Sequence, residues 1–487
     1  MTGKSAVLSD RVAGVLVGMA CGDALGAGYE FGGPLADDYV VEMAGGGAMG
    51  WRPGEWTDDT SMAIAVARAA ANGEDLRDES TQDAVVLGWL TWMATAKDVG
   101  IQTRHVLSAV SASAPAASAA AAALGHHERR GRSGGNGSLM RTAPVALAFL
   151  DDPSGLVAAA RAISSLTHYD PDAADACVLW CLAIREAVVN QRLDLHAGIS
   201  WLDADRQEMW RARIADAQGK RPRDFTKNGW VVEALLAAWS SICEVVGDEL
   251  DAESLDARVL QKVLEAAVRG GRDTDTVAAI AGMLIGGRLG VSAVPVAWQR
   301  VLHGWPGLRQ HDLVDLALAV RSRGSEPGPL DFGYLQSLSQ QTPHPTVDRV
   351  VLGPVNAAPD LSDDVDAVVS LCRVGTEHLP PGLSRDEDHV RIWLIDSTDP
   401  AANAHLEFVL DQAATAVVQL RREGRTVFLH CAAGQSRTPV IAALVAVQEN
   451  GVSPVAALDQ VSAALPDAQP NDYFTRVVAD WPTTPQE

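Results

Sequence analysis

Apolar residues recur at steps of three and four positions along most of the first two thirds of the chain. This period places apolar side chains on one face of a helix, and several of the stretches begin after Asp, Thr or Asn and end in Gly, as capped helices do. The clearest helices are predicted at 58–73, 175–192, 229–246 and 274–290. An alanine-rich stretch, 108–125, is predicted to form a loop and a helix that are separated at Pro115. Strand-like runs are nearly absent here, so we expect an all-α domain.

The pattern changes in the last third, where short β-branched runs alternate with helical stretches. The runs at 349–355, 366–372, 390–396 and 426–431 are predicted strands, and 406–424 is a predicted helix. This alternation indicates a mixed or parallel sheet with helices on its faces. Between the two patterns the chain is polar and rich in proline and glycine, which is typical of a linker. We therefore predict a multi-domain protein with an all-α domain over 8–322, a linker over 323–345 and an α/β domain over 346–487.

Composition narrows the class of protein. The 487 residues include 47% hydrophobic and 21% charged residues, a soluble globular composition with material for more than one core. A formal net charge of −23 disfavours nonspecific binding to nucleic acid or to anionic membranes, although it permits a local basic pocket. The most apolar early stretch is interrupted by Asp23 and lacks a basic flank. We therefore expect neither a signal peptide nor a membrane span, and a cytoplasmic location.

The six cysteines are scattered and show neither zinc-site spacing nor a disulfide framework, but one of them stands apart. Cys431 begins a glycine-bearing turn between an apolar strand and an apolar helix. A thiol at such a turn faces the unpaired N–H groups of the helix start, which favour the thiolate and also bind tetrahedral oxyanions. Arg437, six positions on, can hold two phosphate oxygens in a planar fork. Ser436 and Thr438 add hydroxyls beside the loop.

This loop resembles the signature of the cysteine-dependent protein phosphatases, which is His-Cys, five residues, then Arg and Ser or Thr. Here it runs from His430 to Thr438, and the resemblance covers roughly residues 345–487 and points to the dual-specificity branch. It implies that Cys431 is the nucleophile that forms a phosphocysteine and that Arg437 binds the phosphate. The substrate-binding residues that it implies beside these two are Gly434, Ser436 and Thr438.

The same family uses an aspartic acid to protonate the leaving oxygen, and this sequence offers two. Asp396 stands directly at a predicted strand end, as in the family. Asp399 better matches the family's distance to the cysteine. Both remain candidates for the general acid, and the spacing favours Asp399 slightly.

Two segments of the helical half, 56–67 and 272–282, are similar to each other. Each opens a predicted helix with Thr and Asp. Taken singly, these residues are good helix caps, since acids in a first turn complement the helix dipole. If the two helix starts meet, however, their carboxylates share one site and raise each other's pKa unless a cation neutralises them. Ligands that are all oxygen favour Mg²⁺, or Mn²⁺, over zinc. The set comprises Thr57, Asp58, Asp59, Asp273, Asp275 and Thr276.

Two glycine-rich stretches accompany these segments. One, 14–31, joins an apolar helix to a turn that carries Asp23 and Glu30, and the other, 133–147, holds a loop whose amides suit a phosphate or diphosphate. These four pieces, in this order, resemble the ADP-ribosylglycohydrolase family, the relatives of dinitrogenase reductase-activating glycohydrolase, over about 10–320. The segment 164–173 also matches the family's Thr-His segment.

The resemblance implies a centre of two Mg²⁺ ions, with Mn²⁺ as an alternative, held by the six Thr and Asp residues of the two helix starts. It implies a proton shuttle at Glu30 and a diphosphate pocket lined by Gly135, Asn136, Gly137 and Ser138. Asp23 is either a cap of its turn or part of the site, and His168 is either a substrate-binding residue or a satisfied histidine at a helix end. The implied reaction is hydrolysis at the anomeric carbon of ADP-ribose through an oxocarbenium-like transition state. The acceptor stays open among arginine, serine, a nucleobase and an acetyl ester.

The hypothesis from sequence is thus a two-domain hydrolase. Its substrates are an ADP-ribosylated protein or a small ADP-ribose-containing molecule for the first domain, and a phosphorylated substrate for the second. One alternative is a reader that binds ADP-ribose and a phosphorylated partner without turnover, although binding alone requires neither the carboxylates nor the Cys–Arg pair. Another alternative keeps only the phosphatase active, on a lipid or RNA phosphate.

Overall fold

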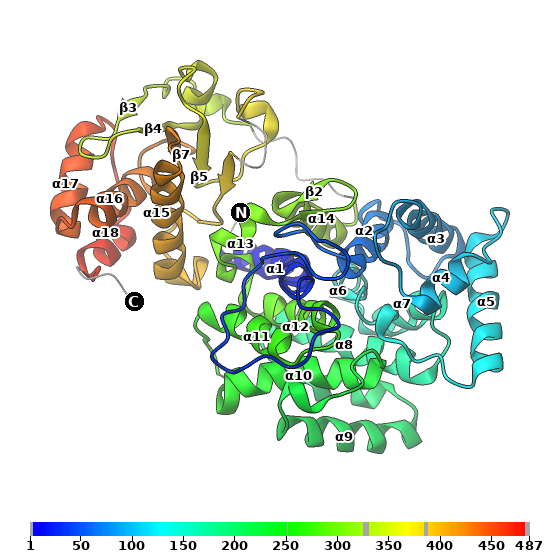
Figure 1. Cartoon of the computed structure of the whole chain (residues 1–487). Helices are drawn as coiled ribbons and strands as arrows, with labels where there is room; N and C mark the ends of the chain where they lie inside the picture. The colour runs from blue at the N-terminus through cyan, green and yellow to red at the C-terminus, as the bar shows by residue number, and fades with distance from the viewer. Residues whose placement is uncertain (1–2, 251, 325–330, 384–387, 483–487) are drawn as a thin grey trace. The chain divides into compact units, whose positions relative to one another are not determined.

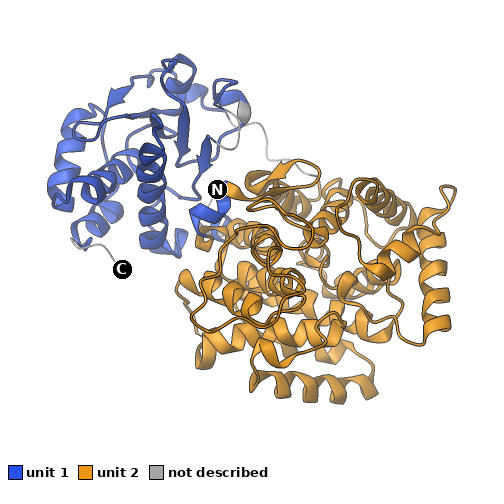
Figure 2. Ribbon diagram, viewed as in Figure 1, with its two compact units in different colours: residues 1–7, 295–300, 327–487 blue, residues 8–294, 301–326 orange. Residues whose placement is uncertain are grey.

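The chain forms two units, which Figure 2 colours separately. The helical unit comprises Leu8–Val294 and Val301–Glu326, and the sheet unit comprises Met1–Val7, Pro295–Arg300 and Pro327–Glu487. The computed structural model describes residues 3–250, 252–324, 331–383 and 388–482. Residues 295–300 cluster with the sheet unit, although their neighbours in sequence belong to the helical unit.

The helical unit is built almost wholly of α-helices, so the all-α prediction is confirmed (Figure 1). The predicted helices are found as α2, α8, α10 and α12, and α5 begins at Pro115, where the sequence predicts a break. A two-residue pair, β1 (His303–Gly304) with β2 (Leu308–Arg309), adds a short ribbon. The helices are α1 (Gly3–Gly26), α2 (Asp58–Ala71), α3 (Glu79–Met93), α4 (Ile101–Leu107), α5 (Pro115–Arg130), α6 (Ala143–Ala148), α7 (Pro153–Ser165), α8 (Pro171–Asn190), α9 (Ala204–Gln218), α10 (Val231–Val246), α11 (Arg258–Arg269), α12 (Thr274–Leu289) and α14 (Gln310–Ser322). Helix α13 (Val296–Val301) consists, up to Arg300, of residues that cluster with the sheet unit.

Helices α1 and α12 pack backbone against backbone. Glycines recur at every fourth position on α1, and a Cβ atom placed on Gly22 would lie 2.1 Å from the carbonyl oxygen of Ala278. A Cβ atom on Gly26 would lie 2.4 Å from the Cα atom of Asp275. Only glycine permits so close an approach, because every other residue adds a side-chain atom where the second backbone lies. The glycine stripe therefore brings the end of α1, which carries Asp23, against the start of α12.

Helix α1 is also apolar enough to resemble a membrane span. Its segment Ser5–Gly26 meets the length and composition of a membrane-crossing helix, and 78% of the window is buried inside the protein. The core helix of a globular protein meets the same criteria. The burial accounts for the apolar character of this helix, since its residues from Val12 to Leu25 contribute to the core.

The sheet unit holds a five-stranded mixed sheet in the order β3-β4-β7-β5-β6, which confirms the predicted α/β class. Strand β3 pairs antiparallel with β4, and the other pairs are parallel. All four predicted strands are present, but β6 ends at Arg391 although the apolar run continues to residue 396. Edge strand β3 was not expected, since it is two residues long and contains Pro343. The strands are β3 (Thr342–Pro343), β4 (Val350–Pro354), β5 (Ala367–Ser370), β6 (His389–Arg391) and β7 (Val427–Cys431), and the helices are α15 (Leu406–Arg422), α16 (Arg437–Asn450), α17 (Pro454–Ala464) and α18 (Asp472–Ala479).

Central strand β7 is buried on both faces, and its side chains alternate between two cores. Val427, Leu429 and Cys431 face the larger core, which contains residues of all four helices. Phe428 faces a smaller core with Val368. The alternation places the thiol of Cys431 on the helix-covered face at the carboxyl end of the strand, where parallel sheets bind ligands.

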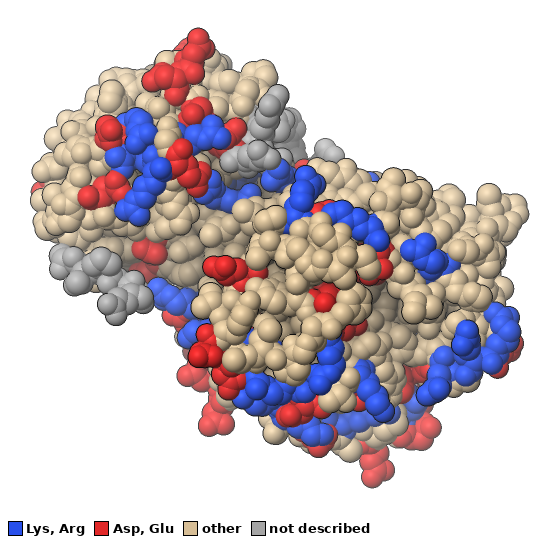
Figure 3. Space-filling model, in the orientation of Figure 1, with Lys and Arg blue, Asp and Glu red and all other residues tan. Residues whose placement is uncertain are grey.

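Acidic and basic side chains are interspersed on the face of the molecule that Figure 3 draws. The negative net charge therefore does not form one continuous acidic patch on that face.

Candidate functional site

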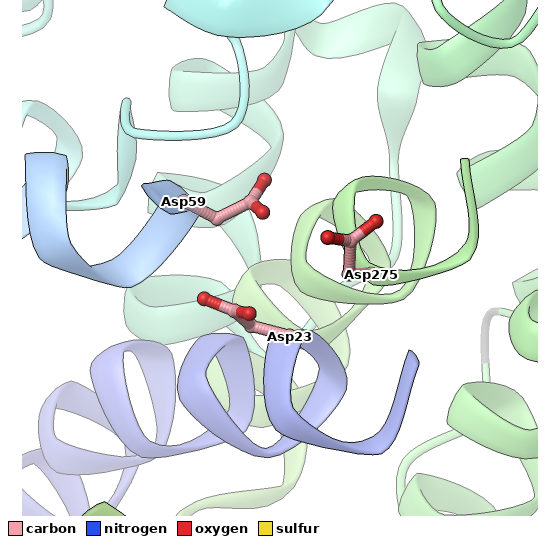
Figure 4. A group of neighbouring side chains, drawn as sticks. All are labelled: Asp23, Asp59 and Asp275. Atoms are coloured by element: carbon pink, nitrogen blue, oxygen red, sulfur yellow. The ribbon is translucent and has the colours of Figure 1, made fainter. Parts of the chain in front are cut away.

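The structure brings together the two helix starts that the sequence singled out, 218 positions apart in the chain. Thr57 at the start of α2 lies with its Oγ1 atom 3.3 Å from Asp275 Oδ2 on the first turn of α12. Carboxylate oxygens of Asp23, Asp59 and Asp275 lie within 4.8 Å of one another (Figure 4). The same holds for Glu30, Asp273 and Asp275. Asp275 belongs to both groups, so the acids form one continuous cluster, the acidic centre.

Asp23 is the cap of helix α2, although it lies on α1. Its Oδ1 accepts a hydrogen bond from the amide of Thr57 over 2.7 Å, and its Oδ2 accepts bonds from the amide and hydroxyl of Thr60 over 2.9 and 2.7 Å. Thr57 and Asp273 occupy the N-cap positions of α2 and α12, but neither side chain makes a capping hydrogen bond. Local capping therefore does not explain why these polar residues stand at the two helix starts.

The acidic centre has too few hydrogen-bond donors for its carboxylate oxygens. Thr57 Oγ1 lies 3.1 Å from Asp59 Oδ2, 3.3 Å from Asp275 Oδ2 and 3.4 Å from Asp58 Oδ1. A hydroxyl has one hydrogen, so it can donate to only one of these three carboxylates. Asp59 Oδ1 and Asp275 Oδ1 are buried and have no hydrogen-bond partner among the described residues. Buried oxygens that face one another without donors fit a bound cation of oxygen-seeking type.

The pKa values of the carboxyl groups also favour a bound cation. Burial raises the pKa of Asp59 and of Asp275 well above the ordinary range, and neighbouring carboxylates add to the increase. Burial and nearby acids also raise the pKa of Asp58 and of Glu30 to about 8. Carboxylates this close cannot all be ionised near pH 7 unless positive charge lies between them.

The remaining predicted ligands flank the acidic centre. Asp58 is half-buried and lies outside both groups of three, although Thr57 Oγ1 reaches its Oδ1. The Thr276 side chain lies close enough to Asp273 to lower the pKa of that carboxyl, although burial raises this pKa overall. Asp58 and Thr276 thus border the two groups.

The glycine-rich loop Gly135–Ser138 is tied directly to the acidic centre. Asn136 Nδ2 donates to Asp273 Oδ2 over 2.8 Å, which fixes the loop beside α12. His168 packs against the other side, since a Cβ atom on Gly137 would lie 3.2 Å from His168 Nε2. Ser138 is buried, and its hydroxyl lies 3.6 Å from the Cys177 sulfur. Gly135, Asn136, Gly137 and His168 are therefore brought together, whereas the Ser138 hydroxyl faces α8.

Two residues of this region were missed from the sequence. Asp98, half-buried between α3 and α4, is close enough to raise the pKa of Glu30 and of Asp58. Asn228 accepts from the amide of Asp273 over 3.3 Å and donates to the carbonyl of Gly271 over 3.0 Å. Neither residue belongs to a recognisable motif. For Asn228, the only local signal is its place directly before a predicted helix.

In the sheet unit, Cys431 ends β7 and Arg437 begins α16, so the predicted strand–loop–helix is present. The Gly434 amide donates to Cys431 Sγ over 3.2 Å, and Gly434 has a φ of +74°, which favours glycine. Arg437 Nη1 donates to the carbonyl oxygens of Leu371 and Leu394 over 2.7 and 3.1 Å. Two backbone carbonyls thus orient one edge of the guanidinium.

A chain of buried hydrogen bonds leads to the cysteine. His430 Nδ1 lies 3.3 Å from the Cys431 carbonyl, which can only accept, so Nδ1 carries a hydrogen. Burial lowers the pKa of His430 to about 4, so the ring is neutral at pH 7 and its Nε2 accepts from Ser370 Oγ over 2.6 Å. Ser370 Oγ in turn accepts from His389 Nε2 over 2.7 Å. The imidazole orientation beside Cys431 is thereby fixed.

The structure separates the two candidate general acids. Asp396 Oδ1 accepts from Ser436 Oγ over 2.8 Å, and Asp396 Oδ2 lies 3.7 Å from Arg437 Nε. Asp399 is exposed and caps a short 3₁₀ turn by accepting from the Ala401 amide over 3.0 Å. Asp396 is therefore the carboxylate that contacts the cysteine loop.

Thr438 follows Arg437 in the first turn of α16. Its hydroxyl oxygen is buried and has no hydrogen-bond partner among the described residues. Its neighbour Ser436, by contrast, bonds both Asp396 and the Asn471 amide.

Comparison with known proteins covers both units. Residues 4–327 match the family model described as ADP-ribosylglycohydrolase. The ADP-ribosyl-[dinitrogen reductase] glycohydrolase of Rhodospirillum rubrum is 30% identical over 304 residues, which cover 61% of this chain and 91% of that protein. The ADP-ribosylarginine hydrolase Tri1 of Pseudomonas putida is 28% identical over 300 residues, 59% of this chain and 73% of that protein. Dual specificity protein phosphatase 1 of Arabidopsis thaliana is 30% identical over 102 residues, 21% of this chain and only 50% of that protein.

Proposed function

The chain belongs to the ADP-ribosylglycohydrolase family, and from that premise we propose that its helical unit releases ADP-ribose from an acceptor at a centre of two divalent cations. The sheet unit resembles the dual-specificity phosphatases, and we propose that it hydrolyses a phosphate ester. The observation that carries the first proposal is the acidic centre, where buried carboxylates from three distant segments converge without enough hydrogen-bond donors.

The donor set indicates which residues would hold the cations. Asp275, common to both groups of acids, would serve both ions, with Asp59 and Thr57 on one side and Asp273 on the other. Asp58 and Thr276 would complete the set from its border. Ligands that are all oxygen select Mg²⁺ or Mn²⁺. Bound cations would supply the positive charge that holds the hydroxyls and diphosphate of the substrate.

The other residues have separate roles in this proposal. The amides of Gly135 and Gly137 bind the diphosphate, whereas the Asn136 amide donates to the Gly229 carbonyl and the Asn136 side chain couples the loop to Asp273. Cleavage at the anomeric carbon requires a proton for the departing acceptor and a base for the attacking water. Glu30 and Asp98, both half-buried carboxylates beside the acidic centre, are the residues that can move these protons.

We infer ADP-ribosylated arginine as the first acceptor to test, because one similar protein is named an ADP-ribosylarginine hydrolase. The experiment follows ADP-ribose release from ADP-ribosylated arginine by the full chain, with Mg²⁺, with Mn²⁺ and with excess chelator. Turnover that requires the cation and is lost in Asp275→Asn supports the proposal. Undiminished turnover in chelator contradicts it, and tight ADP-ribose binding without release would favour a reader instead.

The sheet-unit reaction follows from the cysteine loop. The Cys431 thiolate attacks phosphorus, so that an S–P bond forms and the P–O ester bond breaks. The leaving oxygen takes the proton of Asp396, the acid that lies against the loop. Arg437, held by two carbonyls, directs its remaining N–H groups to the phosphate oxygens. Water then cleaves the S–P bond and restores the thiolate.

A further inference from the structure

We propose that Thr167 and Arg141 fix the tautomer of His168, so that the imidazole carries its hydrogen on Nε2 and donates it to an oxygen of the substrate at the glycine loop. This inference rests on the proposed hydrolysis of ADP-ribose conjugates and adds two positioning residues behind the loop. Neither residue touches the acidic centre through a hydrogen bond.

Arg141 is an unusual starting point, because it is fully buried and has no carboxylate hydrogen-bond partner among the described residues. Its guanidinium lies over the Trp89 ring, 3.9 Å from the ring centroid. Its Nη2 donates to Thr167 Oγ1 over 2.6 Å. Burial lowers the pKa of Arg141 to about 9, so the group is still a cation at pH 7. Its other contacts are longer, 3.4 Å to the Ile163 carbonyl and 3.8 Å to the Met62 sulfur. A buried cation without a carboxylate is costly, which indicates that its place serves a purpose.

Only one arrangement of the hydrogens fits the contacts among Arg141, Thr167 and His168. A guanidinium has donors only, so Thr167 Oγ1 must accept from Arg141. The single hydrogen of that hydroxyl is then free to go to His168 Nδ1, which lies 2.7 Å away. Nδ1 is therefore an acceptor. Burial, the Arg141 cation and His126 lower the pKa of His168 to about 3, so the ring is neutral. A neutral imidazole with an acceptor at Nδ1 carries its hydrogen on Nε2.

The Nε2 edge of His168 faces the glycine loop. A Cβ atom on Gly135 would lie 3.3 Å from Nε2, and one on Gly137 would lie 3.2 Å from it. Among the described residues Nε2 has no hydrogen-bond partner, whereas Nδ1 is engaged by Thr167. Glycine at both positions leaves this N–H uncovered by side chains. The imidazole thus presents a donor beside the glycine loop.

Gln102 holds the backbone beside Thr167 in position. Gln102 Nε2 donates to the carbonyl oxygens of Thr167 and Ser133 over 2.9 and 3.0 Å. The backbone of Thr167 is therefore fixed on the side opposite its hydroxyl, and the segment that leads into the glycine loop is fixed with it. The donor at Nε2 is oriented before substrate arrives, which lowers the entropy lost on binding.

The direct test reads the tautomer without any substrate. Nitrogen-15 NMR of the full chain with labelled histidine distinguishes protonated from unprotonated ring nitrogens, and a His168→Gln variant identifies the resonances among the 12 histidines. We expect a protonated Nε2 and an unprotonated Nδ1 in the wild type and in Thr167→Ser. Thr167→Val should move hydrogen onto Nδ1. A wild-type ring with its hydrogen on Nδ1, or a tautomer unchanged by Thr167→Val, would overturn the proposal.

Kinetics tests whether the donor meets the substrate. Thr167→Val should raise KM for ADP-ribosylated arginine about tenfold with kcat nearly unchanged, as loss of a hydrogen bond made equally in ground and transition states does. Thr167→Ser should restore the wild-type KM. Thr142→Val is the matched control, because it removes another buried hydroxyl, which hydrogen-bonds the sulfur of Cys181. Equal KM values for Thr167→Val and Thr142→Val would contradict the proposed role of Thr167.

The two proposals fail separately. A wild-type chain that releases no ADP-ribose would remove the proposed function, while the NMR spectrum would still decide the tautomer. Free ADP-ribose then serves as the probe of the donor: a shift of the His168 Nε2–H resonance on its addition supports the inference, and no shift at saturating ADP-ribose refutes it.

Discussion

Single residues decide whether the acidic centre is a metal site or a set of caps. Asp23 already caps α2 with three hydrogen bonds, whereas Asp59 and Asp275 each keep a buried oxygen without a partner among the described residues. Such oxygens are costly unless protons or a cation meet them. The charge state of these few carboxylates therefore controls the chemistry of the whole unit.

Metal affinity should depend on pH in a defined direction. The pKa of Asp58 and that of Glu30 are raised to about 8, so protons compete with the cation below that value. Titration calorimetry with Mg²⁺ should show affinity that rises about tenfold or more per pH unit from pH 6 to 8 and levels off above pH 8. An affinity that is flat across this range would show that the carboxylates are already ionised in the free protein.

The two aspartates of the sheet unit should differ sharply. Asp396→Asn should lower kcat for an alkyl phosphate about a hundredfold or more, because the leaving oxygen loses its proton donor. Asp399→Asn, which removes an exposed turn cap, should stay within about twofold and serves as the matched control. Steady-state assays decide the matter, and the reverse order would return the role to Asp399.

Sequence reasoning singled out residues that lie in motifs and missed those that are brought to the site by the fold. Thr57, Asp59, Asp273 and Asp275 could be predicted because each opens a periodic apolar helix. The capping role of Asp23 depends on a partner 34 positions away, so no local pattern reveals it. Asp98 lies in a loop without a motif, and only the folded structure brings it near the other acids, where it raises the pKa of Asp58. The contact of Asp396 with the cysteine loop likewise depends on a partner 40 positions away, Ser436.

At the scale of elements, the close crossing of α1 and α12 positions the acidic centre. The hydrophobic period predicts both helices. It does not predict that the glycines at every fourth position of α1 meet the backbone of α12. Small residues on one helix face allow two backbones to approach, and this approach sets the distance between Asp23 and Asp275. Register between the two helices is thus a determinant of the site.

Widening that crossing should damage both stability and metal binding. In Gly22→Ala the new methyl group would lie 2.1 Å from the Ala278 carbonyl oxygen, so the helices must separate. We expect a loss of about 2–3 kcal/mol in the free energy of unfolding and weaker Mg²⁺ binding. Urea unfolding and calorimetry measure the two effects.

Gly219→Ala is the control for this variant, because nothing lies within 4 Å of its added methyl group. Its effect on stability should stay within about 0.5 kcal/mol. Equal stability of both variants would mean that the glycine stripe does not set the helix distance.

At the scale of the whole molecule, the chain carries two sites of different chemistry on two units. The acidic centre uses residues of the helical unit, and the cysteine loop uses residues of the sheet unit. The change of periodicity along the sequence could predict this division. The grouping of residues 295–300 with the sheet unit could not be predicted, because the residues on both sides of this segment belong to the helical unit.

The two activities should be separable by mutation. Cys431→Ser should abolish hydrolysis of an aryl phosphate, because the hydroxyl is a far weaker nucleophile than the thiolate. Asp58→Ala should leave that hydrolysis intact while it impairs ADP-ribose release. Parallel assays of both reactions on both full-length variants test this, and equal loss of phosphatase activity would show that the sites depend on each other.

The central claim is that two distant helix starts hold two cations between their acids, and the number of Mn²⁺ ions bound by the full chain tests it most directly. Equilibrium binding followed by electron paramagnetic resonance should give two ions per wild-type chain. Asp275→Asn should lose both ions, because Asp275 belongs to both groups of acids, whereas Asp273→Asn, a change in one group only, should weaken one. A wild-type chain that binds no Mn²⁺, or one whose two sites survive Asp275→Asn, would contradict the account.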